Sequence, residues 1–566
     1  MDDREKIRVF ALQNAVKFKG TASKGPIIGK AMGSMPEWRQ KKDELAALVD
    51  EVIEEVNSLS PEEQQRQLEY SGVEEQKKEK QTGLKELKNA ERGKVVMRLA
   101  PSPSGPFHLG HAITGNLTSL YTEKYEGTFI LRIEDTNSDN IYPPAYEQIP
   151  RDADWVFGNV SEVWIQSDRL EIYYQYVKRL IEGGHAYVCT CSPEAFKAKS
   201  DAREDCPCRS CDVEEHLGRW QKMLDGGFAQ GEAVLRFKAD MTHPNPAMRD
   251  FPLARINETP HPRQGTKYRV WPLMNLSVTI DDIEAGMTHI IRGKDHADNA
   301  KRQELMHKAL GNPIPETYFA GRIKFIGLEL SCSKTKKKIE EGVYDGWEDI
   351  RLPFMQPLRR RGYQPGAFKR YALEMGLSKA DKTVDADEFF ASINAYNKEI
   401  IEPIAKRFFF VKDPVQINVK GAPGNKVTMD LHPDMGDGQR VCVLKESLLI
   451  SEDDRGALDK ESICRLKDGC TITGWKTDDY TAEFEAGDYH AFRDKGGKLV
   501  IHWLPAEEEH VRVEVMMPDK TLAKGLGEKH LADHVSVGDI VQFERFGFCR
   551  LDSIEGGVYR FWFCHS

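Results

Sequence analysis

Two histidines three residues apart, His108 and His111, close a segment that begins at Arg98 and is rich in proline and glycine. Imidazoles at this spacing near the start of a helix can point the same way, and each ring can donate a hydrogen bond to a phosphate oxygen. Gly110 lies between them and has no Cβ, so a flat base or a ribose can lie against the backbone there. The segment therefore predicts a phosphate-handling loop; the alternative is a proline-rich turn that happens to contain two histidines.

The residues around this segment indicate the elements that position it. The apolar run at 95–99 is short enough for a buried strand, and the three prolines of the loop exclude helix and sheet until a helix resumes after His111. A strand, a rigid loop and a helix start form a familiar anion site. In it, helix N–H groups and the positive end of the helix dipole meet an anion at the carboxyl edge of a parallel sheet.

Charged residues end the next predicted strands. Thr128–Asp135 is expected to be the second parallel strand, and its Glu134 could receive an ammonium group; an acidic pair that caps the following turn is the alternative. Sheet pattern returns in Leu276–Asp282 and in Met287–His296, where Arg292 could clamp a carboxylate with two hydrogen bonds and reject a neutral amide. An internal salt bridge from Arg292 to the two acids that end the first of these segments is the alternative.

Cysteines gather in one short stretch, since five of the eleven lie between Cys189 and Cys211. Cys189 and Cys191 form one Cys-x-Cys pair and Cys206 and Cys208 form a second, and four thiolates in a tetrahedral array suit zinc. Cys211 is a spare that could replace one of the four, and unligated buried thiols are the alternative. The scattered remaining cysteines do not form a disulfide framework, so a reducing compartment is expected.

The composition bounds the class of protein. A chain of 566 residues with 40% hydrophobic residues is expected to fold into about three to five domains. No apolar run approaches the ~18 residues of a membrane span, and the acidic start lacks the order of a signal peptide. A cytoplasmic protein without a membrane partner is therefore expected. The net charge of −10 argues against a protein that coats nucleic acid indiscriminately, but it permits local basic surfaces.

The remaining segments differ in pattern. Residues 1–94 are charged and mostly helical; a phosphate-loop-like stretch at 19–30 has the wrong glycine spacing and is rejected, and Glu74–Arg92 is expected to be a solvated helix or linker. Residues 339–395 have a helical pattern and carry basic side chains for an RNA backbone, although an ordinary exposed helix surface explains these equally well. Beyond Phe408, short alternating strands separated by turns rich in glycine and aspartate predict β-barrels.

Two of these segments resemble a known family. Pro-Ser-Pro-Ser-Gly at 101–105 and His-Leu-Gly-His at 108–111 are similar to the first signature of class I aminoacyl-tRNA synthetases in their glutamyl branch. Leu328–Lys338 resembles their second signature in a degenerate archaeal form. The Ser-Lys-Thr at 333–335 matches the end of that signature, whereas Ser331 stands where the first lysine is usual. A lysine run by itself is typical of a solvated face, and its place after the second half of the sheet changes that interpretation.

The resemblance covers roughly residues 95–566 and points to the archaeal type of glutamyl-tRNA synthetase, because the bacterial glutamyl branch reads the anticodon with helices. It implies a multidomain fold, α/β plus all-β, with a Rossmann-type class I catalytic domain, an inserted acceptor-binding segment, a helical connector and C-terminal anticodon-binding β-barrels. The expected boundaries are a helical N-terminal extension at 1–94, Rossmann halves at 95–184 and 272–338, an insert with a zinc knuckle at 185–271, the connector at 339–395 and the barrels at 396–566.

The same resemblance implies an activity and its site. The activity is ATP-dependent ligation of L-glutamate to the 3' end of tRNA(Glu) through a glutamyl-adenylate by a monomeric enzyme, with tRNA(Gln) as a second candidate substrate. Mg²⁺ is expected with ATP, and Zn²⁺ at Cys189, Cys191, Cys206 and Cys208. The implied site residues are His108, His111 and Lys334 for catalysis, Arg98, Ser102, Glu134 and Arg292 for the amino acid, and His108, Gly110, His111, Ser333 and Lys334 for ATP.

Two other functions stay open on the sequence. A glutaminyl-tRNA synthetase shares both domains, but its first signature usually contains Pro-Glu-Pro-Asn-Gly and it lacks an arginine at the place of Arg292. A tRNA-binding paralogue without catalysis is suggested by Ser331 in the second signature, although both histidines and Lys334 are retained. The bacterial branch has a tyrosine near position 274, and this chain has Met274, so that substrate contact is not carried over.

Overall fold

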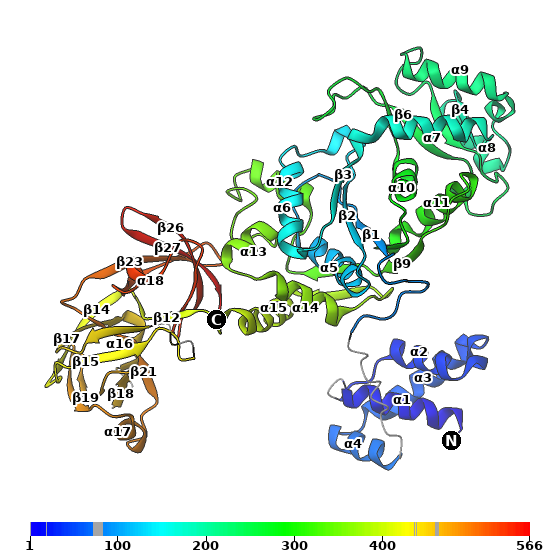
Figure 1. The fold of residues 1–566 in the computed structure, drawn as a ribbon. Helices are drawn as coiled ribbons and strands as arrows, with labels where there is room; N and C mark the ends of the chain where they lie inside the picture. The colour runs from blue at the N-terminus through cyan, green and yellow to red at the C-terminus, as the bar shows by residue number, and fades with distance from the viewer. Residues whose placement is uncertain (1, 18–19, 72–82, 435, 437, 459–462) are drawn as a thin grey trace. The chain divides into compact units, whose positions relative to one another are not determined.

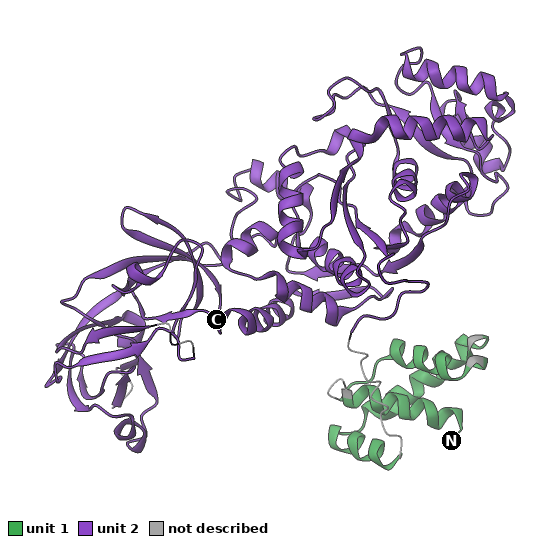
Figure 2. Cartoon of the chain, in the orientation of Figure 1, with its two compact units in different colours: residues 1–82 green, residues 83–566 purple. Residues whose placement is uncertain are grey.

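The structure, a computed structural model, describes residues 2–17, 20–71, 83–434, 436, 438–458 and 463–566. They form two compact units, residues 1–82 and residues 83–566 (Figure 2). The helix or linker expected at Glu74–Arg92 lies outside the described residues as far as residue 82. From residue 83 to the first strand the chain forms bends and turns, so a helix there is wrong.

Among its described residues, the smaller unit contains helices and no strands. In its third helix, apolar residues recur every three or four positions, and Leu45, Val49, Val52 and Val56 are fully buried, as this spacing predicts. These side chains form one core with residues of the other helices. The helices of this unit are α1 (Asp3–Lys17), α2 (Lys24–Ser34), α3 (Lys42–Asn57) and α4 (Pro61–Tyr70).

A parallel sheet opens the larger unit (Figure 1). Strands β1 (Val96–Leu99), β2 (Thr128–Ile133) and β3 (Glu162–Ile165) lie in sequential order, with Leu99 opposite Leu131 and Leu131 opposite Val163. Helices α5 (Leu109–Lys124) and α6 (Ala145–Phe157) connect them and share an apolar core with β1 and β2. This strand-loop-helix succession is the one predicted around the histidine segment.

A second parallel pair continues beside β1. Strand β8 (His289–Gly293) pairs with β9 (Glu316–Ala320), and the N–H of Thr288 donates to the carbonyl of Val96 at 3.1 Å. Strand β8 therefore lies beside β1, on the side opposite its partner β2. Charged residues lie at or beside the ends of β1, β2 and β8.

The stretch Leu276–Asp282, predicted as a strand, is instead the core of helix α10 (Met274–Glu284). All residues from Asn275 to Asp282 are buried, so no polar face marks the helical period. Short apolar runs buried on every side cannot be told from strands by periodicity alone, which explains the error. Helix α11 (Ala297–Ala309) packs beside α10.

An antiparallel sheet and three helices lie between β3 and α10. The strands β4 (Ala186–Cys189), β5 (Val234–Phe237), β6 (Phe251–Ile256) and β7 (Val270–Pro272) pair in sequential order. The helices are α7 (Leu170–Glu182), α8 (Pro193–Ala202) and α9 (Val213–Leu224). The core of this segment is separate from that of the parallel sheet.

A mainly helical region follows the second parallel pair. Its strand β10 (Ile323–Ile326) pairs in parallel with β11 (Lys382–Asp385) and so closes the region on itself. The helices are α12 (Cys332–Glu340), α13 (Met355–Arg361), α14 (Pro365–Met375) and α15 (Ala386–Ile401).

The C-terminal part is rich in strands, as the alternating pattern beyond Phe408 predicts. Two barrel-like sheets of seven strands each have separate cores. The first sheet contains β12 (Lys406–Phe408), β25 (Ile540–Phe543), β26 (Gly547–Glu555), β27 (Val558–His565), β23 (His510–Met516), β24 (Leu522–Glu528) and β13 (Phe410–Lys412). The second contains β21 (Leu499–Ile501), β18 (Ile463–Leu466), β19 (Thr471–Lys476), β20 (Thr481–Ala486), β14 (Pro414–Lys420), β17 (Ser447–Ser451) and β22 (Leu504–Pro505).

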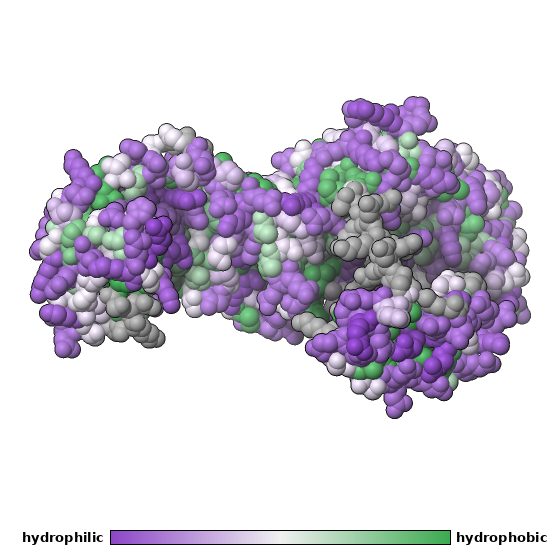
Figure 3. Space-filling model, turned by 90° about the horizontal axis from the view of Figure 1, so that it is seen from below, coloured by the Kyte–Doolittle hydropathy of each residue, from purple (hydrophilic) through white to green (hydrophobic). Residues whose placement is uncertain are grey.

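Hydrophilic residues dominate the surface in view, and apolar residues are confined to small patches (Figure 3). Within the described part of the chain, none of the helices has the length and apolar character that crossing a membrane requires.

Candidate active site

Backbone and capping hydrogen bonds fix the loop of the first signature. His108 is the N-cap of α5, and His111 lies in the first turn of this helix. The predicted helix start after His111 is therefore wrong, because the helix already begins at Leu109. The carbonyl of Pro101 accepts from the N–H of Glu134 at 2.9 Å, which ties the loop to the end of β2. Gly110 leaves room for the imidazole, because a Cβ there would lie 2.9 Å from Cε1 of His108.

Hydrogen bonds fix which nitrogen of each imidazole carries the proton. Nδ1 of His108 accepts from the N–H of Gly110 at 3.1 Å, and Nδ1 of His111 accepts from the N–H of His108 at 3.3 Å. The two rings stack with centroids 3.9 Å apart. Since each Nδ1 is an acceptor, a neutral ring has its proton on Nε2. This N–H can donate a hydrogen bond to a ligand.

Both imidazoles are neutral near pH 7. Burial lowers the pKa of His111 to about 4, and burial together with His111 holds the pKa of His108 well below its usual value. The pair therefore offers two hydrogen-bond donors rather than two positive charges. Such donors can stabilise charge that develops on a phosphate.

The second signature lies against the first. Sγ of Cys332, the first residue of α12, is 4.0 Å from the carbonyl of Pro106, and a Cβ on Gly105 would lie 3.0 Å from this sulfur. Ser331, which stands where the family's first lysine is usual, accepts the N–H of Lys334 at 3.4 Å and caps the helix. Lys334 is exposed, and its Nζ lies 3.2 Å from Glu329. Ser333, and Ser102 of the first signature, are also exposed.

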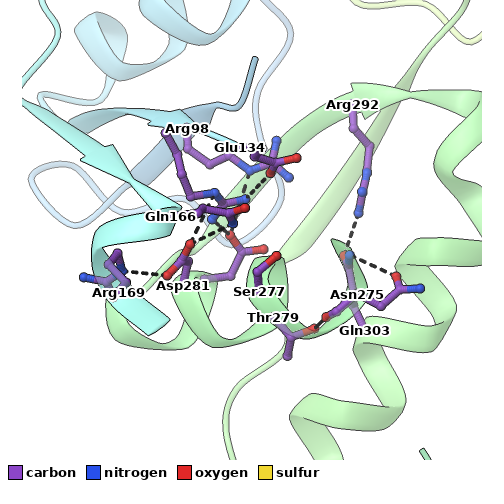
Figure 4. Close-up of polar contacts among 12 residues, drawn as sticks. Arg98, Glu134, Gln166, Arg169, Asn275, Ser277, Thr279, Asp281, Arg292 and Gln303 are labelled. Atoms are coloured by element: carbon purple, nitrogen blue, oxygen red, sulfur yellow. Dashed lines mark hydrogen bonds and ion pairs between the residues drawn. The ribbon is translucent and has the colours of Figure 1, made fainter. Parts of the chain in front are cut away.

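A buried charge cluster lies at the ends of β1 and β2 (Figure 4). Nη1 of Arg132 donates to Asp282 at 2.6 Å, and its Nη2 lies 3.1 Å from Glu134. Nε of Arg98 is 3.8 Å from Asp282. Burial opposes the charge of Arg132, but Asp282, Glu134 and Asp281 together raise its pKa above the ordinary value. The cluster thus contains the predicted Arg98 and Glu134.

Asp281 connects this cluster to helix α7 and to the turn that precedes it. Its carboxylate accepts from Nε of Arg169 at 2.8 Å, from Nε2 of Gln166 at 2.9 Å and from the hydroxyl of Tyr173 at 2.9 Å. With these donors it positions α10 against α7. Arg132 and Asp282 were not predicted as site residues; an arginine within the apolar β2 was the available signal for the first.

Arg292 is the penultimate residue of β8 and is buried without an acidic partner among the described residues. Its Nη1 donates to Oε1 of Gln303 at 2.7 Å (Figure 4). Among the described residues no carboxylate lies within 4.0 Å of it, and its Nε has no hydrogen-bond partner. Burial, and then the charge of Arg98, lowers its pKa to about 10. The alternative of an internal salt bridge to Asp281 or Asp282 is therefore wrong, because those acids bind other arginines.

The four cysteines of the two Cys-x-Cys pairs form one cluster. The Sγ atoms of Cys189 and Cys206 are 3.6 Å apart, as are those of Cys191 and Cys206, and those of Cys191 and Cys208 are 3.7 Å apart. Sulfurs bound to zinc at ~2.3 Å in a tetrahedron are about 3.8 Å apart, so the spacing fits this ion. Cys211 does not belong to the group.

Three family models match the chain. The model described as tRNA synthetases class I (E and Q), catalytic domain, matches residues 94–402, more than half of the chain. Two models for the anti-codon binding domain of the same family match residues 405–488 and 500–552. The chain belongs to the class I tRNA synthetases of the E and Q branch.

The similar proteins narrow the branch. The glutamate–tRNA ligase of Methanocaldococcus jannaschii is 41% identical over 99% of this chain and 100% of that protein. That of Thermococcus kodakarensis is 43% identical over 98% of this chain and 97% of its own length. That of Pyrococcus abyssi is 44% identical over 97% of each. The predicted archaeal glutamyl type of class I synthetase is confirmed.

Proposed function

We propose that this chain is a glutamate–tRNA ligase, which joins L-glutamate to the 3' end of tRNA(Glu) at the expense of ATP. The relatives are glutamate–tRNA ligases over nearly the whole chain. The observation that supports glutamate as the amino acid substrate is Arg292, a buried guanidinium with no carboxylate of the described chain beside it. An uncompensated buried cation is costly unless an anion completes it, and the side-chain carboxylate of glutamate is that anion.

The reaction has two steps. In the first, an oxygen of the glutamate α-carboxylate attacks the α-phosphorus of ATP; the new P–O bond gives glutamyl-adenylate, and the bond to pyrophosphate breaks. In the second, a hydroxyl of the terminal ribose of tRNA attacks the glutamyl carbonyl, and AMP leaves. Little covalent work falls to the protein, so its contribution is positioning and stabilisation of charge.

The roles of the residues follow from their chemistry. Nε2–H of His108 and of His111 would donate to the α-phosphate, and Lys334 would hold the departing pyrophosphate. Gly110 and Ser333 would lie against ATP, close to these donors. Mg²⁺, held by the phosphates of ATP, would neutralise part of their charge.

The amino acid would bind over the buried charge cluster. Arg98 and Ser102 contact it in this proposal, Glu134 receives its ammonium group, and Arg292 receives its side-chain carboxylate. Glu134 is free to do so on one side, because its side chain is 21% exposed although it also binds Arg132. A glutaminyl enzyme is disfavoured by Arg292, and a paralogue without catalysis by the retained histidines and Lys334.

We also propose a function for each segment of the chain. Residues 95–184 and 272–338 would form the nucleotide-binding halves, 185–271 would hold the acceptor end, and 396–566 would read the anticodon. Zinc would be held by Cys189, Cys191, Cys206 and Cys208 and would brace the insert. We further propose that the enzyme is a monomer and that it is cytoplasmic; the cysteine usage supports the location.

Aminoacylation with labelled glutamate tests the proposal. Purified tRNA(Glu) is expected to be charged in an ATP-dependent reaction, and a failure to charge it would contradict the function. The same assay with purified tRNA(Gln) decides whether this second tRNA is also a substrate. Charging of tRNA(Gln) with glutamine in place of glutamate would establish the rival enzyme.

A further inference from the structure

Arg292 depends on a neighbour that is neutral. Gln303 on α11 is buried, and its Oε1 accepts the only hydrogen bond that a described residue receives from the Arg292 side chain. The neighbouring guanidinium groups have carboxylates: Arg98 and Arg132 share Asp282, and Arg169 binds Asp281. Around this centre four arginines therefore face three carboxylates, which are Glu134, Asp281 and Asp282. Among the described residues, Arg292 is the one of the four with no carboxylate within 4.0 Å, and an amide holds it.

A chain of amides fixes how Gln303 is oriented. Nη1 of Arg302 donates to Oδ1 of Asn299 at 3.3 Å, and the same oxygen accepts from Nδ2 of Asn275 at 3.3 Å. Oδ1 of Asn275 then accepts from Nε2 of Gln303 at 3.3 Å, which leaves Oε1 of Gln303 for Arg292. An arginine can only donate, so the guanidinium groups at both ends impose one direction on the whole chain. Figure 4 shows Arg292 extending toward Gln303 and Asn275 of this chain of amides.

We infer that Gln303 is the positioning residue that sets the charge specificity of the site, because it anchors Arg292 without neutralising it. A glutamate at position 303 could accept the same hydrogen bond, but it would complete the guanidinium from inside the protein. Arg292 would then gain less from an anionic substrate and lose less with a neutral one. Asn275 and Asn299 act through Gln303 by holding its oxygen toward Arg292. This inference rests on the proposed function, since it concerns the glutamate side chain.

The matched pair Gln303→Glu and Gln303→Met separates charge from anchoring. Gln303→Glu is nearly isosteric and adds a carboxylate at Arg292, whereas Gln303→Met removes the hydrogen bond and adds no charge. For Gln303→Glu we expect kcat/KM with glutamate to fall about 10- to 100-fold, because the new carboxylate competes with the substrate for the charge-assisted hydrogen bonds of Arg292. The preference for glutamate over glutamine should fall by a similar factor, through KM rather than kcat. Gln303→Met should raise KM for glutamate but keep the preference.

The readout is tRNA-dependent ATP–pyrophosphate exchange with each amino acid, expressed as the ratio of the two kcat/KM values. This ratio does not depend on the fraction of folded enzyme, so partial misfolding of a variant cannot imitate the effect. Gln65→Glu, an exposed position on α4, makes the same substitution away from the site and should leave the ratio unchanged.

The outcomes distinguish the two claims. A wild-type preference for glutamate that survives in Gln303→Glu overturns the role of Gln303 and leaves the proposed function intact. An equal loss of preference in Gln303→Met also overturns it, because a structural effect would then explain both variants. A wild-type enzyme that does not prefer glutamate overturns the inference together with the proposed function.

Discussion

Replacing Arg292 by methionine and replacing Arg132 by methionine should have different effects on stability, although both arginines are buried. Arg132 is completed by Asp282, Glu134 and Asp281, whereas Arg292 has only an amide oxygen. Removal of one partner from a buried ion pair typically costs ~3–5 kcal/mol, because it leaves an uncompensated charge. We expect the free energy of unfolding to fall by about this amount in Arg132→Met.

For Arg292→Met two terms nearly cancel. The pKa of Arg292 is lowered from 12.5 to about 10, and at ~1.36 kcal/mol per pKa unit its charge opposes folding by about 3 kcal/mol. Against this, the oxygen of Gln303 loses its donor, at a cost of ~1–3 kcal/mol. The net expectation is a free energy of unfolding that is unchanged or up to about 2 kcal/mol higher.

The pKa of Arg292 is lower in the folded protein than in the unfolded chain, so the stability cost of its charge depends on pH. Arg292 is charged in both the folded and the unfolded state at neutral pH, so its penalty is fully present below about pH 10. It fades only as the folded protein loses this proton above that pH. The difference in unfolding free energy between Arg292→Met and the wild type therefore does not depend on the exact pH near 7.

Urea unfolding followed by tryptophan fluorescence measures both variants. Eight of the nine tryptophans lie in residues 83–566, so the signal reports mainly on the larger unit. Glutamate at about 100 times its Kd should stabilise the wild type by ~2.7 kcal/mol and should not stabilise Arg292→Met. If Arg292→Met loses as much stability as Arg132→Met, Arg292 is compensated within the protein and the reasoning fails.

Three further predictions concern the phosphate side and the cysteines. Because burial lowers the pKa of His111 to about 4, kcat/KM for ATP should show no protonation step from the two signature histidines between about pH 6 and 8; a histidine step there would contradict the neutral pair. Lys334→Ala should slow glutamate activation ~100-fold or more while tRNA affinity is retained, and unchanged activation in pyrophosphate exchange would refute its role. Metal analysis should find zinc in the purified protein and little in Cys208→Ser, whereas a metal-free wild type would remove the site.

The sequence predicted those parts of the site that follow from local pattern. Glu134 and Arg292 are at or beside the ends of strands whose apolar runs are short and bounded, so the carboxyl edge of the sheet could be identified. The role of Arg98 follows from the family resemblance and not from this pattern. The histidine loop was identified because proline and glycine exclude other structures there. The four-cysteine cluster follows from the spacing of the two pairs.

The residues that tune the site could not be predicted in the same way. Asn275 lies in α10 directly before Leu276–Asp282, the segment whose pattern predicts a strand, and all of these residues are buried, so no polar face marks the helix. Gln303 is an ordinary helix residue until β8 and α11 bring it to Arg292. The pairing of Arg132 with Asp282 joins residues 150 positions apart, and no local pattern encodes such a contact.

The most direct test of the central claim is ATP–pyrophosphate exchange by the wild-type enzyme, with tRNA present and with glutamate or glutamine as the only amino acid. The buried, unmatched charge of Arg292 predicts exchange with glutamate and a kcat/KM at least about 100-fold lower with glutamine, as expected for a site that requires a charged group. Exchange with glutamine alone, or equal exchange with both, would contradict the account.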